Sequence, residues 1–258
     1  EETAPDGFTK VVSDFEFTIV DGKTIPGTAS TTGDVEIDED GNIIVTDKIS
    51  TINVSKEALG SKPLADDNQA TFTLKMTKDA DDDDTTAPSL GGVTIQPKGG
   101  SKITLEDTDT YTFTSNDATF EGLKDGTYTL TEVTAPEGYK KVTTDFEFVV
   151  EDGKIVSSTT ATTGNSKISV SEDGNIIATD DISTIVIDKK KIDGSDYDST
   201  DAKQVAKFTI KGDDLEGVLV NDTAITAEDI ENGAYTFTSN ETKFEGLKDG
   251  TYTLIEET

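Results

Sequence analysis

The sequence repeats itself, and this internal similarity restricts the chain to a few architectures. Residues 111–132, YTFTSNDATFEGLKDGTYTLTE, return at 235–256 as YTFTSNETKFEGLKDGTYTLIE. The opening residues 1–17, EETAPDGFTKVVSDFEF, return at 132–148 as EVTAPEGYKKVTTDFEF. Such self-similarity is typical of an array of structural units. We therefore predict a C-terminal half-repeat at 1–50, a complete repeat at 51–182 and an N-terminal half-repeat at 183–258.

The two half-repeats are complementary. Joining the final residues YTLIEET to the opening EETAPDGF restores the motif found at 128–139. Two explanations stay open: a longer array continues on both sides, or chains complete each other head to tail. We find no signal peptide, transmembrane run or sorting tail, and so expect an internal segment whose targeting signals lie elsewhere.

Each repeat is predicted to consist of β-strands. Apolar residues alternate with Thr and charged residues, and Asp-Gly pairs at 21–22, 40–41, 152–153 and 173–174 are hairpin-turn signals. Short strands separated by frequent turns predict an all-β fold of Ig-like β-sandwiches. A single helical turn is expected at 227–232. An acidic insertion at 79–90, which the neighbouring repeat lacks, is interpreted as a solvated loop.

The composition excludes several functions. The formal net charge is −31, so we expect neither nucleic acid nor an anionic membrane as a partner. Cys and His are both absent, which excludes disulfides, Cys nucleophiles, Ser–His triads and Cys/His zinc sites. We expect no cofactor and no metal.

Three charged residues continue apolar rows on predicted strands. Side chains on a strand alternate between its faces, so the residue two places after an inward apolar residue also points inward. By this rule Lys56 follows Ile52 and Val54, Glu132 follows Tyr128 and Leu130, and Asp180 follows Ile176 and Ala178. The other repeat copies place Lys189, Glu256 and Asp47 in the same way.

Burial of such groups would make them reactive. Desolvation lowers the pKa of an amine and raises that of a carboxyl group. A neutral Lys56 amine is a nucleophile, a protonated Asp180 carboxyl is an electrophile, and Glu132 could transfer the proton between them. The alternative is that all three lie at strand ends and emerge into solvent, as Lys and Glu usually do.

A family resemblance favours the reactive interpretation. The string FEGLKDGTYTLTEVTAPEGY at 120–139 resembles the E-box of CnaB-type domains, a family that includes the B repeats of collagen-binding adhesins and the SpaA-like pilin domains of Gram-positive bacteria. INVSK at 52–56 resembles the first strand of the family, ATFTL at 70–74 the strand that follows, and IIATD at 176–180 the last strand. The resemblance covers essentially the whole chain.

The resemblance implies a prealbumin-like β-sandwich with an internal isopeptide bond. Lys56 would be the nucleophile, Glu132 the catalytic carboxylate and Asp180 the acceptor, although many family members use Asn there. The next site would combine Lys189 and Glu256 with an Asp from a following segment. Glu1 and Asp47 similarly lack a preceding Lys. If chains associate end to end, Lys189 could pair with Asp47 of a neighbour, although the loop after Lys189 is longer and more polar than the family pattern.

We therefore expect a structural stalk or fibre segment of an extracellular, cell-surface protein, with neighbouring repeats or head-to-tail copies of the chain as partners. An adhesin module that binds a host extracellular protein or glycan is the alternative. An enzyme acting on external substrates ranks last, and only single-turnover self-cross-linking is expected.

Three further motifs resemble functional sites, but each has a simpler structural explanation. Glu36, Asp38, Asp40 and Asp47 imitate a calcium loop, but the repeat copy replaces two of these carboxylates with Ser169 and Ser171. The aspartate run at 81–84 is interpreted as a hydrated loop. Lys98 in VTIQPK resembles the pilin lysine that a sortase joins, yet it lies in the middle of a repeat.

Overall fold

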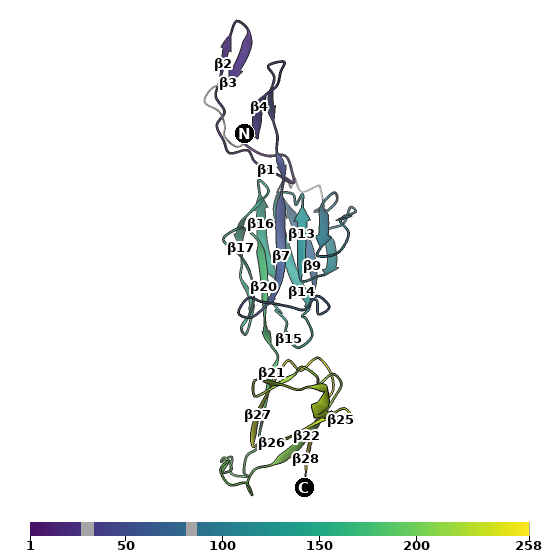
Figure 1. Ribbon diagram of the computed structural model, residues 1–258. Helices are drawn as coiled ribbons and strands as arrows, with labels where there is room; N and C mark the ends of the chain where they lie inside the picture. Colours follow the sequence, from purple (N-terminus) through teal and green to yellow (C-terminus); the bar gives the residue numbers. More distant parts are fainter. Residues whose placement is uncertain (27–33, 81–86, 258) are drawn as a thin grey trace.

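The structure is a computed structural model that describes residues 1–26, 34–80 and 87–257. Within this part of the chain the regular elements are β-strands and one 3₁₀ turn. The predicted all-β class is therefore confirmed. Figure 1 shows three parts that follow one another along an elongated molecule, with the two termini at opposite ends. No helix in the described ranges is long and apolar enough to cross a membrane.

The central part is a sandwich of two sheets. The first sheet has the order β11 (Ile103–Thr104), β10 (Thr94–Pro97), β13 (Asp117–Glu121), β7 (Thr51–Ala58), β20 (Ile176–Ile182), β19 (Ser166–Val170) and β18 (Ala161–Thr163), with β15 (Tyr139–Lys140) on β20 and β8 (Lys62–Pro63) on β7. The second has the order β12 (Thr110–Thr114), β9 (Thr71–Asp79), β14 (Gly126–Thr134), β16 (Phe146–Glu151) and β17 (Lys154–Ser158). The inner faces of both sheets supply one buried core.

Strict alternation explains why these segments become strands of a sandwich. Along β7, every second residue is buried, namely Ile52, Val54, Lys56 and Ala58, while the residues between them are partly exposed. The turn between β16 and β17 uses Asp152 and Gly153, which have φ angles of 50° and 71°. Two consecutive positive φ angles are typical of the tight turns that join antiparallel strands.

The first and last strands of the central sandwich are parallel neighbours. β7 pairs with β20, so Lys56 lies opposite Ala178 and Asp180 lies opposite Ala58. The other strand pairings in the described part of the chain are antiparallel, and among them β14 pairs with β9 so that Glu132 lies opposite Phe72. Lys56 and Asp180 therefore come from adjacent strands of one sheet, whereas Glu132 comes from the facing sheet.

The C-terminal part has two smaller sheets around a second core. Their orders are β21 (Thr184–Asp188), β27 (Glu241–Glu245), β23 (Leu219–Val220) and β24 (Thr223–Ala224) in one, and β25 (Ile230–Glu231), β26 (Ala234–Thr238), β22 (Lys207–Lys211) and β28 (Thr253–Glu256) in the other. The 3₁₀ helix η1 (Ala227–Asp229) lies within the range predicted to form a helical turn. Thr226 precedes it, and its backbone and hydroxyl groups both donate to the Asp229 carboxylate.

The N-terminal part consists of three two-stranded pairs. These are β1 (Phe8–Thr9) with β6 (Lys48–Ile49), β2 (Phe17–Val20) with β3 (Lys23–Pro26), and β4 (Val35–Ile37) with β5 (Ile43–Val45). The β4–β5 turn contains Asp38, whose carboxylate accepts hydrogen bonds from the backbone of Asp40 and Asn42 and from the Asn42 side chain. Asp38 thus closes a hairpin turn, as the alternation around it predicted.

One part of the acidic insertion departs from expectation. The aspartate run at 81–84 lies outside the described residues, so its predicted solvation stays a prediction. Leu90, however, is fully buried, and its backbone N–H donates to Thr108 O at 2.6 Å. The solvated-loop interpretation of 79–90 is therefore wrong at Leu90, because this apolar side chain joins the core.

The three parts are joined by two similar contacts. At the first, Ser50 N–H donates to Gly7 O at 2.8 Å, and Gly122 N–H donates to Ser50 O at 3.0 Å. At the second, Ser183 N–H donates to Gly138 O and Gly246 N–H donates to Ser183 O, both at 2.8 Å. A methyl group on Gly7 or Gly138 would lie 2.9 Å from the carbonyl oxygen of its partner glycine. We call these contacts the glycine–serine junctions.

Candidate cross-linking site

The centre of the sandwich contains three ionisable side chains in contact. Lys56 Nζ lies 2.5 Å from Asp180 Oδ1 and 2.7 Å from Glu132 Oε1. The Lys56 and Glu132 side chains are 0% exposed, and Asp180 is equally buried. The structure therefore brings together the three residues that strand parity directed inward. We call them the central triad.

The surroundings of the triad are apolar. Lys56 Nζ lies 5.8 Å from the centre of the Phe72 ring, which is itself fully buried. Glu132 is held from its other side, because Glu132 Oε2 accepts a hydrogen bond of 2.8 Å from Val142 N–H. Within the described part of the chain, Asp180 Oδ2 has no hydrogen-bond partner. A buried carboxylate without donors is costly, since desolvation disfavours its charged form.

Burial changes the pKa of Asp180, the predicted acceptor. Burial, together with the neighbouring Glu132 carboxylate, raises the pKa of Asp180 to about 7, although Lys56 acts in the opposite direction. A protonated carboxyl group is the form that can lose its hydroxyl as water. The pKa of Asp180 is thus shifted toward the form that an amine can attack.

The C-terminal part contains a second Lys–Glu contact. Lys189 Nζ lies 2.7 Å from Glu256 Oε2. Their side chains are 29% and 49% exposed, in contrast to the completely buried Lys56 and Glu132. Parity predicted an inward direction for both, whereas in this structure both side chains are partly accessible to solvent.

The N-terminal part contains Glu1 and Asp47, the other two residues that the resemblance singled out. Glu1 Oε2 accepts a hydrogen bond of 2.7 Å from Val11 N–H, which repeats the contact of Glu132 with Val142. Asp47 Oδ1 is buried and has no hydrogen-bond partner in the described residues. Desolvation, followed by the nearby Glu1 carboxylate, raises the pKa of Asp47. Glu1 and Asp47 are therefore neighbours, at the opposite end of the molecule from Lys189 and Glu256 (Figure 1).

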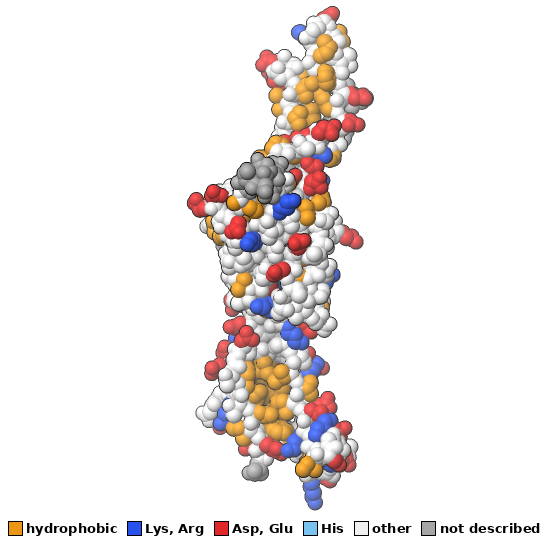
Figure 2. All heavy atoms as spheres, turned by 180° about the vertical axis from the view of Figure 1, so that it is seen from behind, with side chains coloured by type: hydrophobic (Ala, Val, Ile, Leu, Met, Phe, Trp, Pro, Cys, Tyr) orange, Lys and Arg blue, Asp and Glu red, His pale blue; other side chains and the backbone are white. Residues whose placement is uncertain are grey.

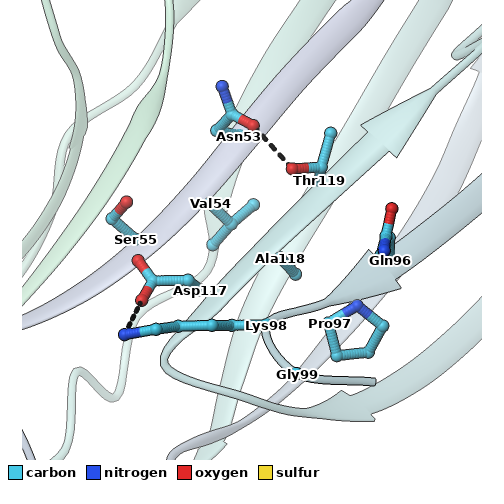
Figure 3. Close-up of a pocket in the computed structure, with 10 residues that line it drawn as sticks. All are labelled: Asn53, Val54, Ser55, Gln96, Pro97, Lys98, Gly99, Asp117, Ala118 and Thr119. Carbon is cyan, nitrogen blue, oxygen red and sulfur yellow. Dashed lines mark hydrogen bonds and ion pairs between the residues drawn. The ribbon is translucent and has the colours of Figure 1, made fainter. Parts of the chain in front are cut away.

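Lys98 lies away from the triad, beside a surface groove. Figure 3 shows it directed toward Asp117, at a distance of 3.6 Å, and its side chain is 62% exposed. Asn53 and Thr119 form a hydrogen bond of 2.8 Å across the adjacent strands β7 and β13. The groove lies on the outer face of the first sheet, so it shares no side chain with the triad.

Sequence reasoning missed two groups that contact the triad, the Phe72 ring and the Val142 N–H group. It also missed the junction serines Ser50 and Ser183. The serines carried a signal, because both occur in the shared string ISTI. A backbone N–H has no sequence signal of its own.

Comparison with known proteins supports the fold. Residues 50–167 match the family model of the SpaA prealbumin-like fold domain, a range that includes Lys56 and Glu132 and ends before Asp180. No curated protein matches the chain.

Among solved structures, the chain is similar to pilus adhesins and a major pilin. The C-terminal fragment of the pilus adhesin SpaC from Lactobacillus rhamnosus GG is 18% identical, with a TM-score of 0.39, and the match covers 81% of this chain and 75% of that one. The major pilin from Streptococcus pyogenes is 18% identical, with a TM-score of 0.36 and coverage of 81% and 82%. The pilus adhesin RrgA from Streptococcus pneumoniae is 21% identical, with a TM-score of 0.33 and coverage of 54% and 16%.

The match to the family model and the two-sheet architecture around the triad both concern the central part. Residues 50–167 of this chain are therefore similar to the SpaA prealbumin-like fold domain.

Proposed function

We propose that the chain is a stalk or fibre segment of a pilus-like cell-surface protein, organised as repeats with boundaries at 1–50, 51–182 and 183–258. The observation that carries this proposal is the contact of Lys56 with Asp180 and Glu132 inside an apolar core. Such a cluster is expensive to keep as separate charges. Its conversion to a neutral amide removes that cost and links the first strand of the repeat to the last.

The reaction balances without a cofactor. The neutral Lys56 amine attacks the Asp180 carboxyl carbon and forms a C–N bond. Glu132 accepts a proton from the nitrogen and donates a proton to the departing hydroxyl, so a C–O bond breaks and one water is released. Each repeat reacts once, and the product is a permanent part of the protein.

The bond would serve a mechanical role. β7 and β20 are parallel neighbours, so a force that separates them would otherwise be resisted only by non-covalent contacts, namely hydrogen bonds and core packing. An amide between them closes a loop of roughly 120 residues, and by analogy with a disulfide this destabilises the unfolded chain by about 5 kcal/mol. The two glycine–serine junctions support the same role, because they fix consecutive parts through backbone contacts.

The intact mass of the purified chain tests the proposal. The wild-type mass should be lower than the sequence mass by one water. The Lys56→Ala and Glu132→Gln variants should each have the full mass of their sequence, whereas Lys189→Ala should still lack one water. A wild-type chain with its full sequence mass would refute the bond.

A further inference from the structure

Asn116 lies in the turn that carries the chain from one sheet of the central sandwich to the other. It follows β12, in the second sheet, and directly precedes β13, in the first. The neighbouring Ser115 supports this turn, because its hydroxyl donates to Asp117 O and accepts a hydrogen bond of 3.1 Å from Asp117 N–H. Asn116 is only 8% exposed. A buried amide side chain is stable only where its polar atoms have partners.

The Asn116 side chain has its partners in the segment that leads into β9. Asn116 Oδ1 accepts a hydrogen bond of 3.2 Å from Ala70 N–H. Asn116 Nδ2 donates to Ala65 O at 3.2 Å and to Asn68 O at 2.9 Å. The side chain therefore uses three of the four hydrogen bonds that an amide can form to hold residues 65–70, which we call the β9 leader.

The main chain of Asn116 holds the proposed nucleophile. Asn116 O accepts a hydrogen bond of 2.6 Å from the backbone N–H of Lys56. This bond continues the pairing of β13 with β7, which ends at Asp117 opposite Ser55. The direction of a side chain on a strand is set by its own backbone. Fixing the Lys56 N–H group thus helps to direct the amine toward the two carboxyl groups of the triad.

The β9 leader connects this contact to the facing sheet. It continues into β9, where Phe72 lies opposite Glu132 and its ring lies 5.8 Å from Lys56 Nζ. In Figure 1 the dark blue chain that follows β7 lies across the lower end of the central sandwich. Figure 2 shows mainly polar surface over the visible face of this part, with hydrophobic side chains in small areas only. The apolar surroundings of the triad are therefore covered from outside.

Asn68 attaches the β9 leader a second time. Its Nδ2 donates to Glu137 O at 3.0 Å, and its Oδ1 accepts a hydrogen bond of 2.6 Å from Glu137 N–H. Glu137 follows β14, the strand that carries Glu132. Asn116 is thus linked through the leader to both strands that surround Glu132, while its own carbonyl holds Lys56.

The C-terminal part contains the same arrangement with a different loop. Asn240 occupies the equivalent place in the shared string TFTSN, and its O accepts a hydrogen bond of 2.7 Å from Lys189 N–H. Asn240 Oδ1 accepts from Ala206 N–H at 3.0 Å, and Asn240 Nδ2 donates to Gln204 O at 2.8 Å. The two loops differ in length and sequence, so the arrangement depends on the Asn and not on the loop that it holds.

We propose that Asn116 is a positioning residue for the cross-linking reaction. Its carbonyl fixes the backbone of Lys56, and its side chain holds the β9 leader, so the amine is kept in line with the Asp180 carboxyl group inside a closed core. Asn116 acts through Lys56 and takes no part in the proton transfer. The inference rests on the proposed internal bond and adds to it a residue outside the triad.

The rate of bond formation tests the inference. The full chain is made in a short cell-free translation, synthesis is stopped, and the fraction of chains lighter by one water is followed by intact mass. Asn116→Ala should slow the loss of water by at least roughly 10-fold, because a misplacement of about 1 Å can cost about 100-fold in rate. Asn240→Ala is the matched control, since it removes the equivalent contacts from the C-terminal part, and it should react at the wild-type rate. An unchanged rate in Asn116→Ala, or equal slowing in both variants, would overturn the inference.

Hydrogen exchange separates positioning from a general loss of stability. It is measured in chains that also carry Glu132→Gln, in which no bond is expected to form. Asn116→Ala should reduce the protection of the Lys56 N–H group, while the amides of β16 stay as protected as before. An equal loss of protection at both places would show that Asn116 only stabilises the fold, which contradicts a positioning role.

Asn116→Asp is the milder variant. It keeps the acceptor for Ala70 N–H and loses the hydrogen bonds donated to Ala65 and Asn68. It should also slow the loss of water, and a wild-type rate would overturn the inference even where Asn116→Ala does not fold. If the wild type itself never loses water, the proposed internal bond is wrong. If the wild type loses water and the Asn116 variants keep its rate, the bond stands and only the positioning role is wrong.

Discussion

The central and C-terminal parts carry the same kinds of residues in different surroundings. Lys56 and Lys189 each contact a glutamate at 2.7 Å, yet the first pair is completely buried and the second is open to water. The difference lies in the strands around them: β16 and β20 cover the central pair, whereas the C-terminal pair lies beside free sheet edges. We expect a Lys–Glu contact alone to be insufficient for the proposed chemistry, and we expect burial away from water to be the further requirement.

The largest expected effect is on thermal stability. Lys56→Met should lower the melting temperature of the central part by roughly 20 °C, because loss of the proposed bond removes about 5 kcal/mol of loop restriction. Lys189→Met, measured on dilute monomer, should change it by no more than roughly 3 °C, since an exposed ion pair contributes little. Differential scanning calorimetry of both variants provides the comparison. Equal shifts would show that the two lysines have equivalent roles.

A smaller effect concerns pH. In Lys56→Met the Asp180 carboxyl stays free and buried, and removal of Lys56 takes away the group that lowers its pKa. The folded state then binds this proton more tightly than the unfolded state, whose pKa is near 3.8. Stability should therefore fall as the pH rises from about 4 to about 7.

Melting temperatures of Lys56→Met at several pH values across this range measure the dependence. Lys189→Met is the matched control, because its Asp180 is consumed in the proposed amide and no longer titrates. The same pH slope in both variants would contradict a reacted Asp180 in the control.

The smallest expected effect concerns the junctions. Gly138→Ala places a methyl group 2.9 Å from Gly246 O, whereas Gly164→Ala meets no atom within 4 Å. Both glycines have a positive φ, so each substitution costs about 1 kcal/mol in backbone strain. Only Gly138→Ala should broaden the distribution of molecular lengths in small-angle X-ray scattering. A similar broadening in Gly164→Ala would show that the contact of Gly138 with Gly246 does not limit the range of molecular lengths.

The sequence predicted the sandwich because its strands alternate so regularly. Ile52 and Val54 fixed the inward face of β7, and the same parity placed Lys56, Glu132 and Asp180 on inward faces. Two features could not be predicted from this alternation. Parity gives the face of a strand but not its neighbour, so the parallel pairing of β7 with β20 could not be predicted. Parity also does not show whether a side chain is shielded from solvent by other parts of the protein. Lys189 and Glu256 were therefore expected to be buried, whereas they are partly exposed.

The glycine–serine junctions and the burial of Leu90 were also not predictable from the sequence. Ser50 acts mainly through its backbone groups, and these look identical in every residue until the chain is folded. Leu90 follows an acidic run, so local composition suggested solvent, whereas its own apolar side chain determined its place in the core.

The most direct measurement of the central claim is a tryptic map of the wild-type chain. The account predicts that residues 49–75 and 168–189 appear as one branched species whose mass is the sum of both peptides minus one water, because an acylated Lys56 resists trypsin. Fragmentation should locate the branch at Lys56 and Asp180. Cleavage after Lys56, with residues 49–56 and 168–189 recovered as separate unmodified peptides, would contradict it.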